Sequence, residues 1–106
     1  MEVLYRSTRG NGSTVTASNA ILKGLSEDGG LFVPDQIPVL DVPVEQLAQM
    51  SYQEVAYEVM SRFLTDFTEE ELKKCIQSAY DKKFDTDVIA PLVKADGAYY
   101  LELFHG

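Results

Sequence analysis

Two helix-start signals in the middle of this chain limit what it can fold into. The hydroxyl of Ser51 can accept a hydrogen bond from the amide of Glu54, whose carboxylate can return the bond to the serine amide, and Thr68 and Glu71 repeat this capping box. Apolar residues at helical spacing follow each signal. Because only residues 64–68 separate the two segments, we predict two helices that form an antiparallel hairpin.

The amino-terminal third reads as short strands around a short helix. Residues 3–8 predict a strand, and a glycine-rich loop follows it at residues 9–13. Residues 14–24 predict a helix, with Thr14 or Thr16 as its cap and Gly24 as its stop. After a turn at residues 27–30, a short buried strand is expected at 31–33, ended by Pro34.

The rest of the chain adds little regular structure. Prolines at positions 34, 38 and 43 predict an extended connection, and residues 44–49 predict a single helical turn. A last strand is expected at about 98–104, after the Asp96-Gly97 turn. The fold class predicted from these elements is α+β: a small domain with a two-helix antiparallel hairpin, a short amino-terminal helix and a few short strands.

Length and charge narrow the function classes. The chain has 106 residues, the size of one small domain, and its net charge is −8. Such an acidic surface repels phosphodiester backbones and anionic lipid, so we expect no nucleic-acid partner and no membrane partner. The first residues lack the basic and apolar regions of a signal peptide, which predicts a cytoplasmic protein.

The apolar strand expected at 98–104 comes close to the end of the chain. A domain seldom stops on such a strand without a polar cap. We therefore expect residues 1–106 to be a single amino-terminal domain of a larger protein, with the sequence truncated after Gly106.

No catalytic constellation is visible in the residues. His105 is the only side chain that ordinarily titrates near neutrality, but it has no neighbours that would tune it. Cys75 has no nearby histidine and reads as a core or boundary residue. The loop at 9–13, with Arg6 and Arg9, could cradle a phosphate, although it lacks the ending of a P-loop. Helix capping explains the glutamates at 69–71, so no metal site is expected.

Several segments together resemble the amino-terminal domain of threonine synthase, a pyridoxal-phosphate enzyme of fold type II. The segments are residues 5–10, 20–25, 28–34, 50–56, 64–68 and 100–106. They cover essentially the whole chain in the family's order, and 28–34 and 101–106 are the most specific.

The resemblance implies an activity for the full-length enzyme. That enzyme converts O-phospho-L-homoserine and water to L-threonine and phosphate, by a γ-elimination followed by hydration with pyridoxal 5'-phosphate as electron sink. The family's cofactor lysine would lie just beyond Gly106, so no catalytic, cofactor-binding or metal-binding residue is expected in this chain. The fragment alone would then be inactive and bind no cofactor, and its partner would be the catalytic lobes of its own chain.

Four residues are weak candidates for the substrate cleft of that enzyme. Ser7, Thr8 and Arg9 place two hydroxyls and a guanidinium beside a glycine loop, and His105 is the fourth. Two alternatives stay open: a related phospholyase that acts on another phosphorylated amino alcohol, and a free-standing acidic protein-interaction module.

Overall fold

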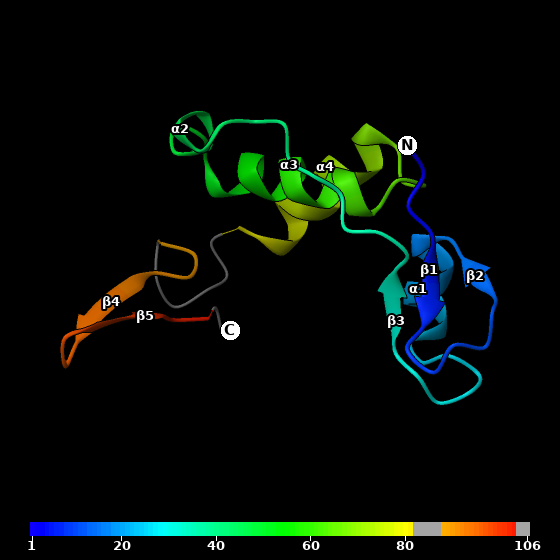
Figure 1. Cartoon of the computed structure of the whole chain (residues 1–106). Helices are drawn as coiled ribbons and strands as arrows, with labels where there is room; N and C mark the ends of the chain where they lie inside the picture. The colour runs from blue at the N-terminus through cyan, green and yellow to red at the C-terminus, as the bar shows by residue number, and fades with distance from the viewer. Residues whose placement is uncertain (82–87, 104–106) are drawn as a thin grey trace.

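The computed structural model describes residues 1–81 and 88–103, and it confirms the α+β class. Figure 1 shows an amino-terminal sheet with one helix, a central helical region and a separate β-hairpin. The elements in chain order are β1 (Tyr5–Ser7), β2 (Thr14–Val15), α1 (Ala17–Lys23), β3 (Phe32–Pro34), α2 (Val44–Leu47), α3 (Tyr52–Phe63), α4 (Glu69–Ala79), β4 (Leu92–Ala95) and β5 (Ala98–Leu101).

The first three strands form an antiparallel sheet in the order β2-β1-β3. Arg6 in the middle of β1 lies opposite Thr14 on one side and Val33 on the other. The helix α1 buries two small residues, Ala17 and Ala20, one turn apart. Because the buried side chains of α1 are alanines, its backbone can lie close to the elements that it packs against.

Two boundaries in this region differ from the prediction. The helix expected from residue 14 begins only at Ala17: Thr14 and Val15 instead pair with β1, and Thr16 is the cap. The strand expected at 31–33 begins at Phe32 and includes Pro34; it is half-buried rather than buried, and Leu31 is exposed. Because β3 is an edge strand of the described sheet, a proline without an amide hydrogen is tolerated there.

Both predicted capping boxes are present. The Glu54 amide donates to Ser51 Oγ at 3.2 Å, and the Glu71 amide donates to Thr68 Oγ1 at 3.1 Å. The helices α3 and α4 pack against each other, which confirms the predicted hairpin. Residues 44–49 also give the expected single turn, as α2.

The turn between α3 and α4 fastens the hairpin to the amino-terminal unit. The amide of Val3, a fully buried residue, donates to Thr65 Oγ1 at 3.0 Å. The amide and hydroxyl of Ser18 both donate to the Asp66 carboxylate. Burial opposes ionisation of Asp66, yet these bonds lower its pKa, and its negative charge lies at the amino end of α1, where the helix dipole favours it.

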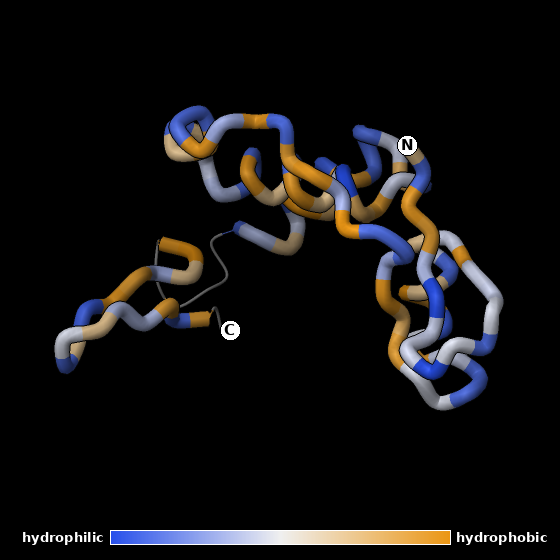
Figure 2. Tube along the Cα trace, in the orientation of Figure 1, coloured by the Kyte–Doolittle hydropathy of each residue, from blue (hydrophilic) through white to orange (hydrophobic). Residues whose placement is uncertain are grey.

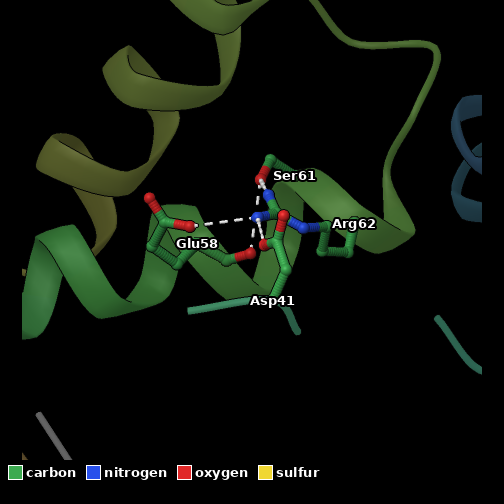
Figure 3. A network of polar contacts seen from close by, with 4 residues as sticks. All are labelled: Asp41, Glu58, Ser61 and Arg62. Carbon is green, nitrogen blue, oxygen red and sulfur yellow. Dashed lines mark hydrogen bonds and ion pairs between the residues drawn. The ribbon is translucent and has the colours of Figure 1, made fainter. Parts of the chain in front are cut away.

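A second fastening holds the extended connection against α3. Arg62 donates to Asp41 at 2.8 Å, to Glu58 at 3.3 Å and to the hydroxyl of Ser61 at 3.1 Å (Figure 3). The bond to Asp41 is the main cause that raises the pKa of Arg62. This network ties residue 41, far from α3 in sequence, to the last turn of that helix.

The hairpin of β4 and β5 stands apart from the other elements (Figure 1). Asp96 and Gly97 both have positive φ, at 51° and 77°, which is the turn that suits a two-residue hairpin. Every residue of both strands is exposed. The strand β4 was not predicted, the strand expected at 98–104 ends at Leu101, and residue 104 lies outside the described residues. Within the described residues, no helix has the length and apolar content to cross a membrane.

Candidate functional site

The end of β1 meets the turn at residues 27–30 in a group of polar contacts. Ser7 is only 4% exposed, and its hydroxyl donates to Asp28 Oδ1 at 2.6 Å. The amide of Gly30 donates to the same oxygen at 2.9 Å. The amide of Arg9 in turn donates to Ser7 Oγ at 3.1 Å. One carboxylate oxygen thus joins two segments that are far apart in the sequence.

The neighbouring residues complete this group. Arg9 Nη1 donates to the carbonyl oxygen of Asp28 at 2.8 Å, and the amide of Leu31 donates to Thr8 Oγ1 at 3.0 Å. We call Ser7, Thr8, Arg9, Asp28, Gly29 and Gly30 the Ser7–Asp28 cluster.

The cluster requires both of its glycines. A Cβ on Gly30 would lie 2.1 Å from Ser7 Oγ and 3.1 Å from the backbone nitrogen of Arg9. Gly29 has a φ of +84°, and a Cβ there would lie 2.7 Å from Arg9 Nη1. Gly30 therefore allows the turn to approach β1 more closely than any other residue type would permit, whereas at Gly29 the positive φ is the main reason for glycine.

The chemistry of the cluster is that of a structural lock. The Ser7 hydroxyl is buried and donates its hydrogen bond to the Asp28 carboxylate. Thr8 and Arg9 are exposed, and the guanidinium of Arg9 is the charged group at the surface of the cluster. In the loop beyond it, Asn11 Nδ2 donates to Ser26 Oγ at 3.3 Å, which ties the predicted loop at 9–13 to the same turn.

The hydrogen bonds to Asp28 make the fold acid-sensitive. The Ser7 hydroxyl first, and then the Gly30 amide, lower the pKa of Asp28 below its ordinary value, and burial opposes them only in part. A carboxyl with a lowered folded pKa contributes stability above its unfolded pKa of about 3.9, and that contribution is lost as pH falls through the folded pKa.

We therefore expect the thermal midpoint of the chain to fall between about pH 4.5 and pH 2.5, in part through Asp28. The variant Asp28→Asn should start from a lower midpoint at pH 7 and lose less of it on acidification. Glu45→Gln, on an exposed residue of α2, is the control and should follow the wild type. If the thermal midpoints of Asp28→Asn and the wild type fall by the same amount between about pH 4.5 and pH 2.5, Asp28 does not have this role.

The other candidate residues lie away from the cluster or cannot be placed. His105 and Gly106 lie outside the described residues. Cys75 is exposed on α4 rather than in the core. In the described part of the chain, no three histidine, cysteine or carboxylate side chains are grouped as metal ligands would be.

Three lysines of the described segments have partners outside this cluster. Lys23 pairs with Glu27 at 3.6 Å, and Lys73 pairs with Glu69 at 2.6 Å. Lys94 lies over the ring of Tyr99 in the β-hairpin. None of these amines belongs to the Ser7–Asp28 cluster, so no reaction step is assigned to it.

The chain is similar to threonine synthases along its whole length. The family described as "Threonine synthase N terminus" matches residues 4–80. Threonine synthase of Schizosaccharomyces pombe is 40% identical over 99% of this chain and 21% of the relative, and the Saccharomyces cerevisiae enzyme is 34% identical over 97% and 22%. Threonine synthase-like 2 of Rattus norvegicus is 30% identical over 96% and 22%.

Solved structures agree with the sequence comparison. The crystal structure of threonine synthase from yeast matches 85% of this chain and 18% of its own, with a TM-score of 0.74 and 34% identity. Pyridoxal-phosphate-bound threonine synthase from Brucella melitensis matches 99% of this chain and 23% of its own, with a TM-score of 0.80 and 34% identity. This chain spans about a fifth of the length of the curated relatives. It belongs to the threonine synthase family, in the region that forms the amino terminus of those enzymes.

Proposed function

We propose that residues 1–106 act as the amino-terminal structural domain of a threonine synthase, which converts O-phospho-L-homoserine and water to L-threonine and phosphate. The observation that carries this proposal is the match of 99% of the chain to the pyridoxal-phosphate-bound Brucella melitensis enzyme. A cytoplasmic location is part of the same proposal.

The chemistry is assigned to the part of the enzyme that this chain does not contain. Pyridoxal phosphate supplies an electron sink for the elimination and hydration when it is bound. The Ser7–Asp28 cluster has no lysine, and its Ser7 hydroxyl and Asp28 Oδ1 are used in internal hydrogen bonds. We therefore propose that the catalytic lobes hold the cofactor and that the present residues fold and position the chain that leads to them.

A chimera tests this role. In it, the present chain replaces the residues of the Schizosaccharomyces pombe enzyme with which it aligns; the comparison protein is that enzyme with the same residues deleted. We expect the chimera to bind pyridoxal phosphate, seen by visible absorbance, and to release phosphate from O-phospho-L-homoserine, whereas the deleted enzyme and the 106-residue chain do neither. A chimera no more active than the deleted enzyme would refute the domain role.

The same chimera tests the related-phospholyase alternative, which is supported by two relatives named threonine synthase-like 2. The chimera and the unaltered Schizosaccharomyces pombe enzyme have the same catalytic part, so their substrate preferences can be compared directly. A shift in preference toward a second phosphorylated amino alcohol would therefore come from the present chain and would favour that alternative.

A substrate-cleft role for Ser7, Thr8, Arg9 and His105 is part of the proposal, and Arg9 is its testable member. Its guanidinium is exposed, and guanidinium groups match phosphate in charge and geometry. The buried Ser7 would act only indirectly, by accepting the amide of Arg9.

We expect Arg9→Ala in the chimera to lower kcat/KM for O-phospho-L-homoserine by roughly tenfold or more, the size of one lost charge-assisted hydrogen bond. Lys74→Ala, which removes an exposed positive charge on α4 outside the Ser7–Asp28 cluster, is the control. If Arg9→Ala lowers only the thermal midpoint and leaves kcat/KM unchanged, Arg9 belongs to the lock alone.

A further inference from the structure

The helix α1 leaves apolar side chains uncovered next to the face that it buries. Ala17 and Ala20 are buried, but Ile21 is 62% exposed. Leu31 and Leu25, joined by a β-bridge just beyond the helix, are about as exposed as Ile21. Figure 2 shows apolar stretches in β3 close to α1. These residues are too close together to be the scattered apolar residues of an ordinary surface.

An open groove of about 380 Å³ lies beside these residues. Its walls come from β1, α1, β3 and the end of the helical hairpin, and include Tyr5, Ala20, Ile21, Leu31, Phe32 and Leu64.

The groove has almost nothing to offer a polar ligand. Its one side-chain polar group is the hydroxyl of Tyr5, which already donates to the carbonyl oxygen of Phe63 at 3.0 Å. Burial is the main cause that raises the pKa of Tyr5, so this hydroxyl stays neutral. A small-molecule site places several polar groups to orient its ligand. The groove lacks them and suits an apolar segment of protein.

The charge distribution also favours a packed surface here. Residues 1–34 carry three basic and three acidic side chains, so the net charge of −8 falls on the later residues. Docking of the amino-terminal unit therefore has no net charge to desolvate or repel, whereas the acidic remainder of the chain is better solvated by water.

We propose that this groove seats an apolar segment from the catalytic part of the threonine synthase chain, and that the amino-terminal unit docks on that part through Ile21 of α1 and Leu31, the residue just before β3. This inference rests on the proposed function, because the relatives carry about four-fifths of their length outside the matched region. The Brucella melitensis enzyme contains this same fold as 23% of a longer chain, which supplies the covering material.

Two substitutions on adjacent residues test the groove. Ile21→Lys puts a charge into it, while Leu22→Lys makes the same change one residue along α1 at a site that is 83% exposed and does not line the groove. Because both sites are exposed, neither variant should alter the thermal midpoint of the 106-residue chain. In the chimera, Ile21→Lys should speed amide hydrogen exchange of residues 20–31 by about tenfold or more, because the docked face opens, whereas Leu22→Lys should match the parent.

Equal exchange in the two chimera variants would overturn the docking proposal. The proposal would also be overturned if the amides of residues 20–31 exchange as fast in the parent chimera as in the 106-residue chain, while the amides of α3 and α4 remain protected in both proteins. Dimerisation of the 106-residue chain that Ile21→Lys abolishes would assign the groove to a second copy instead. A chimera that protects residues 20–31 but releases no phosphate would refute the proposed function and leave the docking surface standing.

Discussion

Gly30→Ala is expected to lower the free energy of unfolding of this chain by about 3 kcal/mol, at the upper end of what overpacking costs. The added methyl group would lie 2.1 Å from Ser7 Oγ, and the backbone nitrogen of Arg9 lies 3.1 Å from the same point. Relief by rotation of Ser7 would break its bond to Asp28, and relief by movement of the backbone would separate β3 from β1. Urea denaturation of the wild type and variant measures the loss.

A second glycine and a double variant separate this steric effect from backbone strain. Gly12 has a φ of +83° but open space around its Cβ position, so Gly12→Ala should cost only the positive-φ backbone penalty of about 1–2 kcal/mol. Adding Ser7→Ala to Gly30→Ala removes the closest clash. It should therefore cost less in that background than in the wild type. Similar losses for Gly30→Ala and Gly12→Ala would show that the close approach of Gly30 to Ser7 is not what holds the turn.

The close approach at Gly30 also gives a physical reason for two segments of the family resemblance. Residues 5–10 and 28–34 are separate segments of that resemblance, and in the structure they meet in one set of hydrogen bonds. Ser7, Arg9, Asp28 and Gly30 each take part in these bonds. What the sequence presents as two motifs is, in the folded chain, one lock between β1 and the turn before β3.

The sequence predicted the helical hairpin well because two independent signals agree there. The capping boxes at Ser51 and Thr68 depend only on residues three positions apart, and the apolar periodicity that follows each box points to the same helix. Local chemistry is readable without knowledge of the rest of the fold.

The elements that the sequence did not reveal depend on distant partners. Thr14 and Val15 look like the start of a helix, yet they pair with β1, and nothing near them in sequence signals that pairing. The strand β4 becomes a strand only through β5. The bond from Ser7 to Asp28 joins two separate segments, so the sequence offered Ser7 as a weak substrate-cleft candidate without indicating this partner.

Ile76→Ala should have the second large effect, a loss of about 3 kcal/mol in the free energy of unfolding, the middle of the range for emptying a buried aliphatic site. Ile76 is 3% exposed, and Leu72, one turn earlier on α4, is 4% exposed. These two are the only residues of α3 and α4 that are fully buried. A hairpin with so little buried apolar surface has few other contacts to compensate for the cavity. The urea midpoint should therefore fall, and the helical circular-dichroism signal should be lost in the same transition.

The neighbouring residue provides the matched control. Cys75 is exposed on the same turn of α4, so Cys75→Ala should change the free energy of unfolding by less than about 0.5 kcal/mol. The hydrogen bonds from Val3 to Thr65 and from Ser18 to Asp66 connect the amino-terminal unit to the turn before α4. Loss of α4 should therefore weaken these bonds as well. Ile76→Ala should therefore also expose the amides of β1. Protection of β1 that survives melting of α4 would show instead that the amino-terminal unit folds without the hairpin.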